Sequence, residues 1–400
     1  MDRFGDKICC NPTVKLKKQE SYPVIDIDKI TPGYKAVRSV ASIEYTGQGG
    51  AKFQDHDVLF ARITPCLENG KMAIADTEGQ NGIGSTELFV FRGIDGVSDT
   101  DYVYYLLCMK HIRQLAANSM TGASGRQRAD LDFIKRIQWD FPDIEMQKKI
   151  ASVLSAYDNL IEVNNKRIDF LEQIAENLYK EWFVRFRFPG HETAEFENGI
   201  PEGWAYRRAD EVIDFNPTLK TGNQTEFTII PMEALSTNSM VLDSGCFVRQ
   251  DSISGRRSQN GDTLLAKITP CLENGKTGFV MGMPENEVLG GSTEFVVMRS
   301  KALTPHYVYC IARSYYFRQT AILSMNGADG RQRVDEDKLK STKILQPEKT
   351  VLDHFETIVT PIFDGVYQMV QENKNLIQQR DLLLPRLMSG KLEVQYALND

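Results

Sequence analysis

The sequence predicts an α+β protein with two tandem mixed α/β domains, separated by two long helices packed as a pseudo-two-fold symmetric antiparallel coiled coil. Three observations predict this. DVLFARITPCLENGK at 57–71 returns as DTLLAKITPCLENGK at 262–276, with 12 of 15 positions identical. GASGRQR at 122–128 returns as GADGRQR at 327–333, again 205 residues later. A heptad seam follows each copy. A repeat this long indicates a duplicated domain.

The composition fits an intracellular globular protein. The chain has 400 residues, of which 42% are hydrophobic, enough for two or three domains with their own cores. No apolar run resembles a signal peptide or is long enough to span a bilayer. The seven cysteines form no CxxC pair, so we expect reduced thiols and a cytoplasmic location. A net charge of −7 argues weakly against nucleic-acid binding, but a local basic patch is sufficient for it.

The first domain is predicted to span residues 1–145. Asn69 and Gly70 both tolerate positive φ, so we expect a two-residue hairpin turn between neighbouring strands. Alternating apolar residues and β-formers indicate strands, and a later apolar stretch indicates a helix. These elements are expected at 23–30, 57–63, 71–76, 85–91 and, for the helix, 101–117.

The second domain, residues 205–346, repeats the same order. Its copies of the first and last of these strands are expected at 228–235 and 292–298. Its helix opens with Thr304 and Pro305, a capping residue before a proline at the first helical position. A linker rich in Gly, Pro and Glu at 188–204 precedes it.

Each domain is followed by a long predicted helix, at 146–187 and 347–392, and a tail occupies 393–400. Apolar residues recur with an unbroken spacing of four and three, which is typical of a coiled-coil seam. Asn164 and Asn373 lie within the seams, where a buried amide fixes register. Pro361 and Pro385 are expected to fray or bend the second helix. The first seam is Ile150, Leu154, Tyr157, Ile161, Asn164, Ile168, Leu171, Ala175, Leu178 and Trp182; the second is Phe355, Val359, Ile362, Val366, Met369, Asn373, Leu376, Arg380, Leu383 and Leu387.

Two similar domains joined by antiparallel helices suggest two readings. A seam from 150 to 182 is about 50 Å long at ~1.5 Å per residue, so a stiff pair of helices can hold two readers over separate segments of DNA. The same layout also suits a scaffold that holds two copies of a protein partner without contacting DNA. Geometry alone leaves both readings open.

Several motifs resemble one family, the specificity subunits of type I restriction–modification systems. They are LFARITPCLENGK, GSTE and GRQR in tandem copies, YKEWFVRF at 179–186, IPEGW at 200–204 and RDLLLPRLMSGKL at 380–392. The resemblance covers essentially the whole chain. It implies that each domain is a target-recognition domain for one half of a bipartite double-stranded DNA site. It also implies that the helices set the spacing and hold two modification (methyltransferase) subunits, which restriction (motor-nuclease) subunits join.

The resemblance further implies a subunit with no catalytic centre. S-adenosylmethionine, ATP and magnesium would then belong to the partner subunits. The sequence agrees with this expectation, because it contains no NPPY-like methyltransferase motif and no GxxxxGK phosphate loop. Its five histidines show no metal-ligand spacing.

The candidate DNA-binding residues fall into shared and divergent groups. Arginines flanking an amide suit phosphate contacts, but they can equally pair with acids of their own domain. The lysines after the LENG turns and the hydroxyls of GSTE are further candidates, although tight turns and caps also require such residues. The shared candidates are Arg126, Gln127, Arg128, Arg331, Gln332, Arg333, Lys71, Lys276, Ser85, Thr86, Ser292 and Thr293.

Residues that read bases should lie where the two copies differ. GQGGAKFQ at 47–54 stands opposite SISGRRSQ at 252–259, and Arg and Gln are usual major-groove readers of guanine and adenine. An ordinary exposed loop explains these residues equally well. The candidates are Lys52, Gln54, Arg256, Arg257 and Gln259. Because the domains are so alike, we also predict two similar half-sites on opposite strands.

Overall fold

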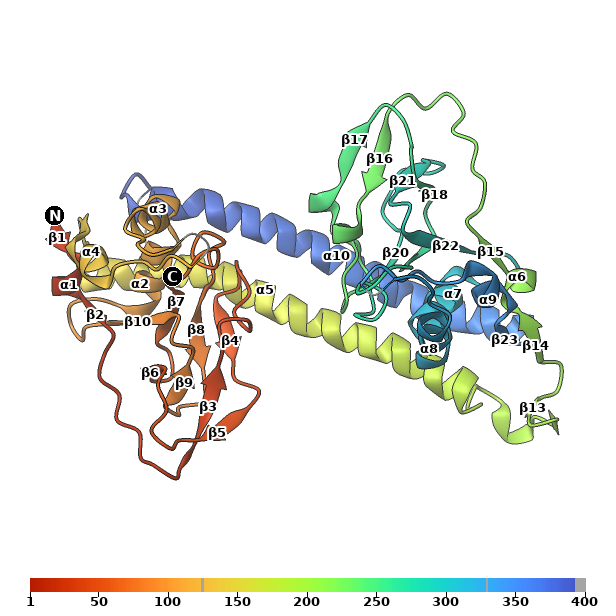
Figure 1. Ribbon diagram of the computed structural model, residues 1–400, viewed down its shortest axis with the longest axis horizontal. Coiled ribbons are helices and arrows are strands. Elements are labelled where there is room, and N and C mark those ends of the chain that lie inside the picture. The colour runs from red at the N-terminus through yellow and green to blue at the C-terminus, as the bar shows by residue number, and fades with distance from the viewer. Residues whose placement is uncertain (124–125, 329, 393–400) are drawn as a thin grey trace, which may run out of the picture. The chain divides into compact units, whose positions relative to one another are not determined.

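The computed structural model describes residues 1–123, 126–328 and 330–392, and the chain divides into two compact units (Figure 1). Unit 1 is Met1–Val163 together with the chain from Asn373, and unit 2 is Asn164–Glu372. The first predicted domain lies in unit 1 and the second in unit 2. Each long helix contributes one part to each unit, because the units divide at Val163/Asn164 and at Glu372/Asn373. The predicted domain limits at 146 and 347 instead treat each helix as a separate segment.

Unit 1 contains two small mixed sheets. The order of the first is β2-β10-β7-β8-β4, and that of the second is β5-β3-β9-β6. The pairs β4–β8 and β3–β9 are parallel, and the other neighbours are antiparallel. The strands are β2 Ile8–Cys10, β3 Ser21–Ile25, β4 Ala36–Arg38, β5 Ser42–Glu44, β6 Ala51–Phe53, β7 Val58–Ala61, β8 Met72–Asp76, β9 Gly82–Gly84 and β10 Leu88–Gly93.

Short elements complete unit 1. β1 at the start of the chain pairs with β11, which joins the two ends of the first domain. Three helices follow the sheets in sequence, and α1 lies between β1 and β2. These elements are β1 Asp2–Arg3, α1 Phe4–Lys7, α2 Thr100–Cys108, α3 Lys110–Asn118, α4 Leu131–Arg136 and β11 Gln138–Trp139.

Unit 2 repeats this arrangement in the order β15-β22-β19-β20 and β17-β16-β21-β18. Its N-terminal strand β14 pairs with β23, as β1 pairs with β11. The strands are β14 Ala205–Arg208, β15 Ile213–Phe215, β16 Phe227–Ile230, β17 Val248–Gln250, β18 Arg256–Ser258, β19 Thr263–Ala266, β20 Thr277–Phe279, β21 Leu289–Gly291, β22 Phe295–Ser300 and β23 Lys343–Gln346. The helices are α6 Ala209–Val212, α7 Pro305–Arg313, α8 Tyr315–Leu323 and α9 Glu336–Ser341.

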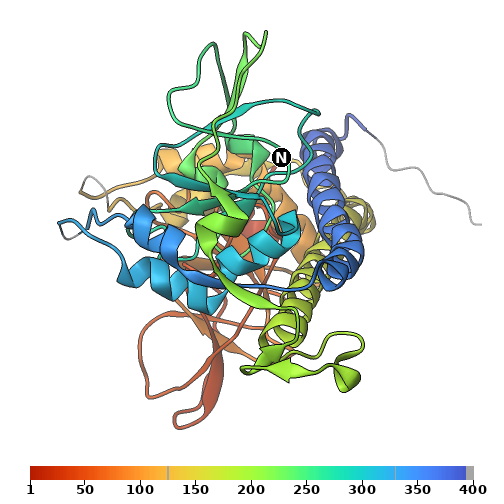
Figure 2. The same ribbon diagram turned by 90° about the vertical axis from the view of Figure 1, so that its right-hand side faces the viewer.

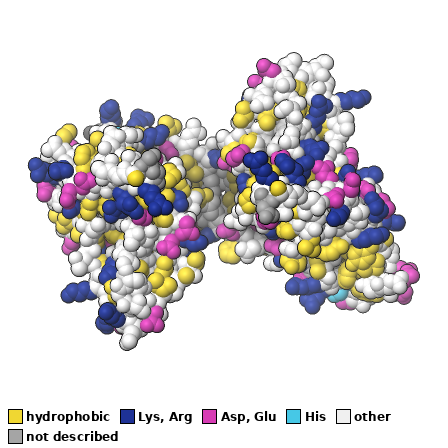
Figure 3. Space-filling view, viewed as in Figure 1, with side chains coloured by type: hydrophobic (Ala, Val, Ile, Leu, Met, Phe, Trp, Pro, Cys, Tyr) yellow, Lys and Arg dark blue, Asp and Glu magenta, His cyan; other side chains and the backbone are white. Residues whose placement is uncertain are grey.

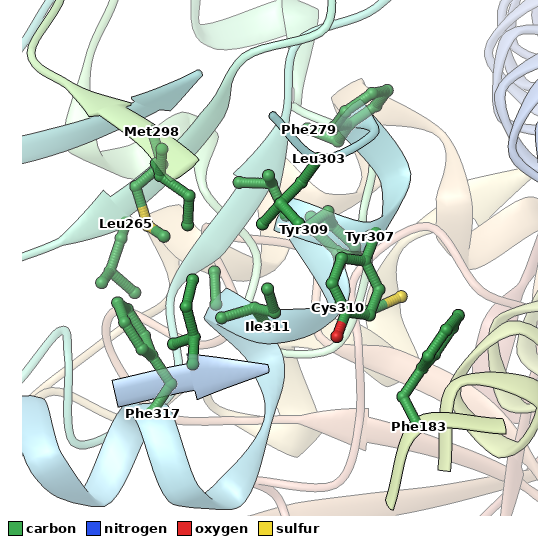
Figure 4. Packing of buried hydrophobic residues seen from close by; sticks show 14 of the residues in the cluster. Phe183, Leu265, Phe279, Met298, Leu303, Tyr307, Tyr309, Cys310, Ile311 and Phe317 are labelled. Carbon is green, nitrogen blue, oxygen red and sulfur yellow. The ribbon is translucent and has the colours of Figure 1, made fainter. Parts of the chain in front are cut away.

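The central strands are buried on both faces, because each sheet has apolar neighbours on either side. In β7, Val58 and Phe60 join the core beneath α2, whereas Leu59 faces a second cluster with Ile25 and Phe53. Unit 2 is packed in the same way, and Figure 4 shows its aromatic and aliphatic core around Tyr307. Side chains that alternate between the faces of a strand explain why the 57–63 and 262–268 segments read as apolar runs.

The expected hairpin at Asn69-Gly70 is wrong in its length. β7 and β8 pair antiparallel, with Leu59 opposite Ala73, but residues 62–71 form a long connection between them. Its backbone folds into helical turns, in which Leu67 N donates to Ile63 O at 3.0 Å. Gly70 closes these turns with a φ of 73°, so its left-handed conformation ends a turn rather than making a two-residue hairpin.

Strand limits also differ from the expected ones. β10 begins at Leu88 and β22 at Phe295, because the Ser-Thr-Glu residues before each strand form a turn. β3 ends at Ile25, and β16 ends at Ile230 before a 3-10 turn at Met232–Ala234. Alternation of apolar residues continues past both strand ends, which explains the longer expectation.

The expected single helix at 101–117 is two helices, α2 and α3, that meet at Met109. The ψ of Met109 is 128°, which is extended rather than helical. In the second copy Ser314 separates α7 from α8 and has a ψ of 145°. Its hydroxyl accepts a hydrogen bond from Phe317 N, so Ser314 caps α8 and explains the break. Thr304 stands before Pro305 as expected, but its side chain makes no capping hydrogen bond.

The two long helices are α5, Ile144–Tyr179, and α10, Lys349–Met388. A π-helical turn, Lys180–Val184, extends α5. The helix α10 runs through Pro361 and Pro385, so neither proline ends it. The linker region forms a 3-10 turn at His191–Thr193 and a small hairpin of β12, Phe196–Glu197, with β13, Ile200–Pro201.

Within each unit the two long helices pack antiparallel. In unit 1 the start of α5 lies against the end of α10, where Leu154 and Leu387 belong to one core cluster. In unit 2 the end of α5 lies against the start of α10 (Figure 2). The rings of Trp182 and Phe355 are 5.9 Å apart there. The predicted class, two mixed α/β domains with an antiparallel helix pair, is therefore confirmed.

Every predicted seam residue lies at least partly buried. Asn164 is 1% exposed and donates from Nδ2 to Glu372 Oε2 at 3.0 Å. Those fully buried are Ile150, Leu154, Ile161, Asn164, Ile168, Ala175, Trp182, Phe355, Val359, Val366, Asn373, Arg380 and Leu387. Those partly buried are Tyr157, Leu171, Leu178, Ile362, Met369, Leu376 and Leu383.

The helix pair is held differently in the two units. In unit 1, Arg380 on α10 pairs with Asp158 on α5, and Asp158 also accepts from Tyr105 Oη at 2.5 Å. At the equivalent helix position in unit 2, Phe363 packs on Phe279, with ring centres 5.3 Å apart. At this position unit 1 therefore has a buried ion pair between α5 and α10 with a hydrogen bond from α2, whereas unit 2 has aromatic packing of α10 on β20.

Candidate nucleic-acid interface

The motifs that recur in both domains come together on one surface in each unit. In unit 1, Thr64 N donates to Gln127 O at 3.0 Å, and Ala129 N donates to Arg62 O at 2.8 Å. The backbone of Arg128 bridges Ile63. The ITPCLENGK connection and the GRQR loop are thus backbone neighbours. Residues 124 and 125 of that loop lie outside the described part of the chain.

Unit 2 repeats these contacts. Thr269 N donates to Gln332 O at 3.1 Å, and Val334 N donates to Lys267 O at 2.9 Å. Arg333 bridges Ile268. On the face seen in Figure 3, Lys and Arg side chains gather in patches on each unit. The repeated motifs therefore share a common place in the fold, although they are far apart in sequence.

One arginine of each GRQR motif is used within its own domain. Arg128 makes a two-point ion pair with Glu87, and Arg333 makes the same pair with Glu294. Hydrogen bonds from these arginines lower the pKa of both Glu87 and Glu294, so the carboxylates are ionised near neutral pH. These ion pairs hold the GSTE turn against the RQR segment. Both motifs recur in both domains, and this repetition could have identified Glu87 and Glu294 as partners of the arginines.

The other arginine of each motif is exposed. Among the residues that the structure describes, neither Arg126 nor Arg331 has an acidic partner. The adjoining amides, Gln127 and Gln332, are half-buried, and their backbone carbonyls are occupied. Arg126 and Arg331 are thus the members of GRQR best placed to contact a phosphate.

The remaining shared candidates are mostly tied to their own domain. Lys71 Nζ donates to Ile27 O at 3.0 Å, and Lys276 Nζ donates to Met232 O at 3.1 Å. These lysines brace the connection against a neighbouring loop. In the GSTE turns, Ser85 Oγ accepts from Glu87 N and Ser292 Oγ accepts from Glu294 N, at 3.1 and 3.2 Å. Thr86 and Thr293 are exposed beside them.

The divergent candidates make different contacts in the two units. Lys52 Nζ donates to Tyr45 Oη at 2.6 Å and lies 4.8 Å from the centre of that ring. Arg257 donates to the carbonyl of Leu219, and Arg256 pairs with Glu336 at 2.8 Å. Gln54 is exposed and Gln259 half-buried, and the backbone N–H of each is bonded to an aspartate.

A pair of arginines that the sequence analysis did not single out lies over the LENG turns. A Cβ placed on Gly70 would be 2.2 Å from Arg113 Nη1, and one on Gly275 would be 3.2 Å from the guanidinium of Arg318. Arg318 Nη2 also donates to Glu273 O at 3.2 Å. Glycine suits both turns because Gly70 and Gly275 have φ values of 73° and 83°, and the absence of a side chain also leaves room for the arginine above each turn. Arg113 and Arg318 stand at the same position of the repeat, 205 residues apart, and this agreement could have identified them from the sequence.

Unit 2 also presents an aromatic surface. A groove of about 1040 Å³ lies between α5, the π-helical turn and α7–α8. Tyr315 and Tyr316 line it and are 80% and 59% exposed. Phe170 and Ile174 on α5 are also exposed, but they do not line the groove. Exposed apolar side chains concentrated in this way mark an interaction surface rather than an ordinary exterior.

Neither a metal site nor a membrane helix is found in the part of the chain that the structure describes. Over residues 1–123, 126–328 and 330–392, no three His, Cys, Asp or Glu side chains are grouped so that they could hold a metal ion. Within the same residues, no helix combines the length and apolar character needed to cross a bilayer.

Known proteins are similar to this chain in sequence. Residues 8–173 match the family described as "Type I restriction modification DNA specificity domain". The MjaIX specificity subunit of the type I restriction enzyme of Methanocaldococcus jannaschii is 25% identical over 76% of this chain and 72% of its own length. The MjaVIII specificity subunit of that organism is 23% identical over 98% of this chain and 92% of its own length.

A solved structure shares the fold. The S subunit of a type I restriction–modification system from M. genitalium aligns over 96% of this chain and 94% of its own, with a TM-score of 0.53 and 14% identity. The family match covers the first domain and part of α5, and the second domain repeats the motifs of the first. Residues 8–173 therefore match the type I restriction modification DNA specificity domain, and the chain as a whole is similar to type I restriction enzyme specificity subunits.

Proposed function

We propose that this chain is the DNA sequence-specificity subunit of a type I restriction–modification complex, in which each domain reads one half of a bipartite double-stranded DNA target. The observation that carries the proposal is the meeting of ITPCLENGK, GSTE and GRQR on one surface in each unit. Two surfaces of the same construction suit two duplex segments of the same geometry. Because the motifs are shared, we propose that they grip the phosphate backbone and that the half-sites resemble each other on opposite strands.

The long helices are proposed to set the distance between the half-sites. At ~1.5 Å per residue, a helix the length of α5, 36 residues, extends about 54 Å. No residue is assigned a catalytic role. Methyl transfer and cleavage are assigned to the partner subunits, together with S-adenosylmethionine, ATP and magnesium.

The phosphate-gripping role of GRQR is tested by removing its exposed arginines. We expect Arg126→Ala and Arg331→Ala each to weaken binding by a similar factor on target and unrelated DNA, because phosphate contacts carry no sequence information. The slope of log affinity against log salt should fall by about 1 for each variant. Binding of the complex with its modification subunits is measured by fluorescence anisotropy at several salt concentrations.

Arg3→Ala, an exposed arginine on β1, is the matched control for loss of one charge. It should leave the salt slope unchanged. A flat salt response of the wild-type complex, with both GRQR variants indistinguishable from it, would instead favour a protein-assembly scaffold without DNA contact.

The aromatic groove of unit 2 is proposed to dock a modification subunit, and a second such subunit is proposed to bind unit 1. Leu160 and Val163 on the unit 1 part of α5 are 39% and 42% exposed, which gives that unit an apolar surface of its own. Exposed tyrosines are common anchors of protein interfaces, because they bury a large area at low cost in side-chain entropy.

Truncating one groove tyrosine tests the docking surface. We expect Tyr315→Ala to weaken association with the modification subunit by ten-fold or more, since such anchors contribute about 2 kcal/mol. Native mass spectrometry of the assembled complex gives the measurement. Leu323→Ala is the control, because Leu323 is also on α8 and 82% exposed but does not line the groove. Equal assembly of both variants would contradict docking at this groove.

A further inference from the structure

The two recognition surfaces differ at one charged cluster that unit 2 has and unit 1 lacks. In unit 2, Glu336 at the start of α9 accepts three hydrogen bonds. Arg256 Nη2 and Lys267 Nζ each reach Oε1 at 2.8 Å, and Asn216 Nδ2 reaches Oε2 at 2.8 Å. The side chains of Arg256, Lys267 and Glu336 are 31%, 13% and 23% exposed, so that of Arg256 is the most accessible of the three.

In unit 1 the repeat places Ala51, Arg62 and Leu131 at the positions of Arg256, Lys267 and Glu336. Asn11 keeps the backbone contact of its counterpart, accepting from Val90 N at 2.8 Å. Within the described residues Arg62 has no carboxylate within 4.0 Å, its guanidinium lies 4.7 Å from the ring of Phe89, and its Nε is buried without a partner.

The cluster lies on the surface already assigned to DNA. Lys267 is the residue whose carbonyl accepts from Val334 N, directly after the second GRQR motif. Arg256 is the first residue of β18 and pairs with Gly291. Gly291 is the first residue of the GSTE motif and precedes Ser292. The cluster therefore borders all three motifs that the two domains share.

Net charge does not distinguish the two versions. Burial alone would raise the pKa of Glu336, but Lys267 and Arg256 outweigh it and lower that pKa, so Glu336 is an anion. Two cations and one anion give unit 2 the same net charge of about +1 that Arg62 alone gives unit 1. The two units should therefore attract phosphate equally at this place. They differ because only unit 2 holds a guanidinium, that of Arg256, in a fixed orientation against a carboxylate.

We propose that Arg256 is a base-reading residue of the second domain and that Glu336 is the positioning residue that orients it. An arginine carries five N–H donors in a fixed fork, and only one of its nitrogens is bound to Glu336. The remaining donors suit the O6 and N7 acceptors of a guanine in the major groove. Ala51 offers no donor in the first domain, so the half-sites differ at the position that Arg256 reads. The inference rests on the proposed function and refines the similarity of the half-sites.

The test uses the complex with its modification subunits and measures both the methylated sequence and binding to duplexes with each base at every half-site position. Arg256→Ala should relax one position of one half-site, with discrimination falling about 5- to 150-fold, the range expected for a bidentate arginine–guanine contact. The other half-site should be read as before, which shows in the same experiment that the variant is folded and assembled.

Two further readouts separate base reading from phosphate contact and from a merely structural role. The salt slope should be unchanged by Arg256→Ala, whereas loss of a phosphate contact lowers it by about 1. Glu336→Gln keeps the shape of the side chain but loses its charge, and should relax the same single position partially. Glu336→Asp, which restores the carboxylate, should recover part of the selectivity.

The first domain supplies the reciprocal experiment. Introducing both groups there, as Ala51→Arg with Leu131→Glu, should add a guanine preference to the first half-site only. Unchanged selectivity at both half-sites in Arg256→Ala, or a uniform loss of affinity with a lower salt slope, would overturn the assignment. Failure of the wild-type complex to discriminate any sequence would instead overturn the proposed function itself.

Discussion

Replacing Ile168 by aspartate is expected to separate the helices of unit 2 and abolish assembly with the modification subunits. Ile168 is 7% exposed and belongs to the main core cluster of unit 2, together with Val359 and Val366 on α10. An unpaired carboxylate in this place loses its hydration without gaining a partner. We expect the free energy of unfolding to fall by about 3–5 kcal/mol, as for other uncompensated buried charges. Thermal melting and size-exclusion chromatography of the complex provide the measurements.

Ile161→Asp extends this test to unit 1, where Ile161 is 3% exposed. Ala156→Asp is the control, because Ala156 is exposed on the same helix and its replacement costs only about 0.7 kcal/mol of helix propensity. If the two isoleucine variants matched Ala156→Asp in melting temperature and in assembly, the seam would not be what holds the helices together.

The second large effect is expected at the buried ion pair of unit 1. The side chains of Arg380 and Asp158 are 9% and 4% exposed, and Arg380 also donates to Gly33 O at 3.1 Å. Arg380→Met removes the ion pair of Asp158 but leaves its hydrogen bond from Tyr105, and it also removes the contact between α10 and the loop at Gly33. Removal of one member of a buried pair typically costs about 3–5 kcal/mol. Denaturant unfolding of the complex measures the change.

The double variant Asp158→Leu with Arg380→Met separates the two contributions. It removes the unpaired charge as well, and replacement of a buried pair by apolar groups is often close to neutral. It should therefore recover more than half of the stability that the single variant loses. A single variant within 1 kcal/mol of wild type, or a double variant no better than the single one, would show that the pair does not stabilise the junction.

The duplicated architecture was predictable from the sequence, because each repeated motif adopts the same local structure in both units. The seam was predictable as well, since the four-three spacing places residues such as Leu154 and Val359 on the buried side of their helices. Local turn preferences were a weaker guide. Asn69 and Gly70 suit a hairpin, but contacts of the 62–71 connection with the GRQR loop fold it into helical turns instead.

The site residues were less predictable because their contacts join segments far apart in the chain. The sequence does not show that Arg128 meets Glu87, 41 residues away, or that Arg256 meets Glu336, 80 residues away. The same applies to Lys71 and Lys276, which the sequence marks as DNA-binding candidates. Their ammonium groups donate to the carbonyls of Ile27 and Met232, each 44 residues earlier in the chain. Comparison of the two copies found the divergent position at Arg256, but only the fold supplied its partner.

The most direct test of the central claim is genome-wide mapping of methylated bases in cells that carry this chain and its modification subunits. Two recognition domains predict one bipartite motif, with two defined half-sites on either side of an unread gap. The shared surfaces predict half-sites that resemble each other on opposite strands. A continuous motif without a gap, or methylation that does not depend on this chain, would contradict the account.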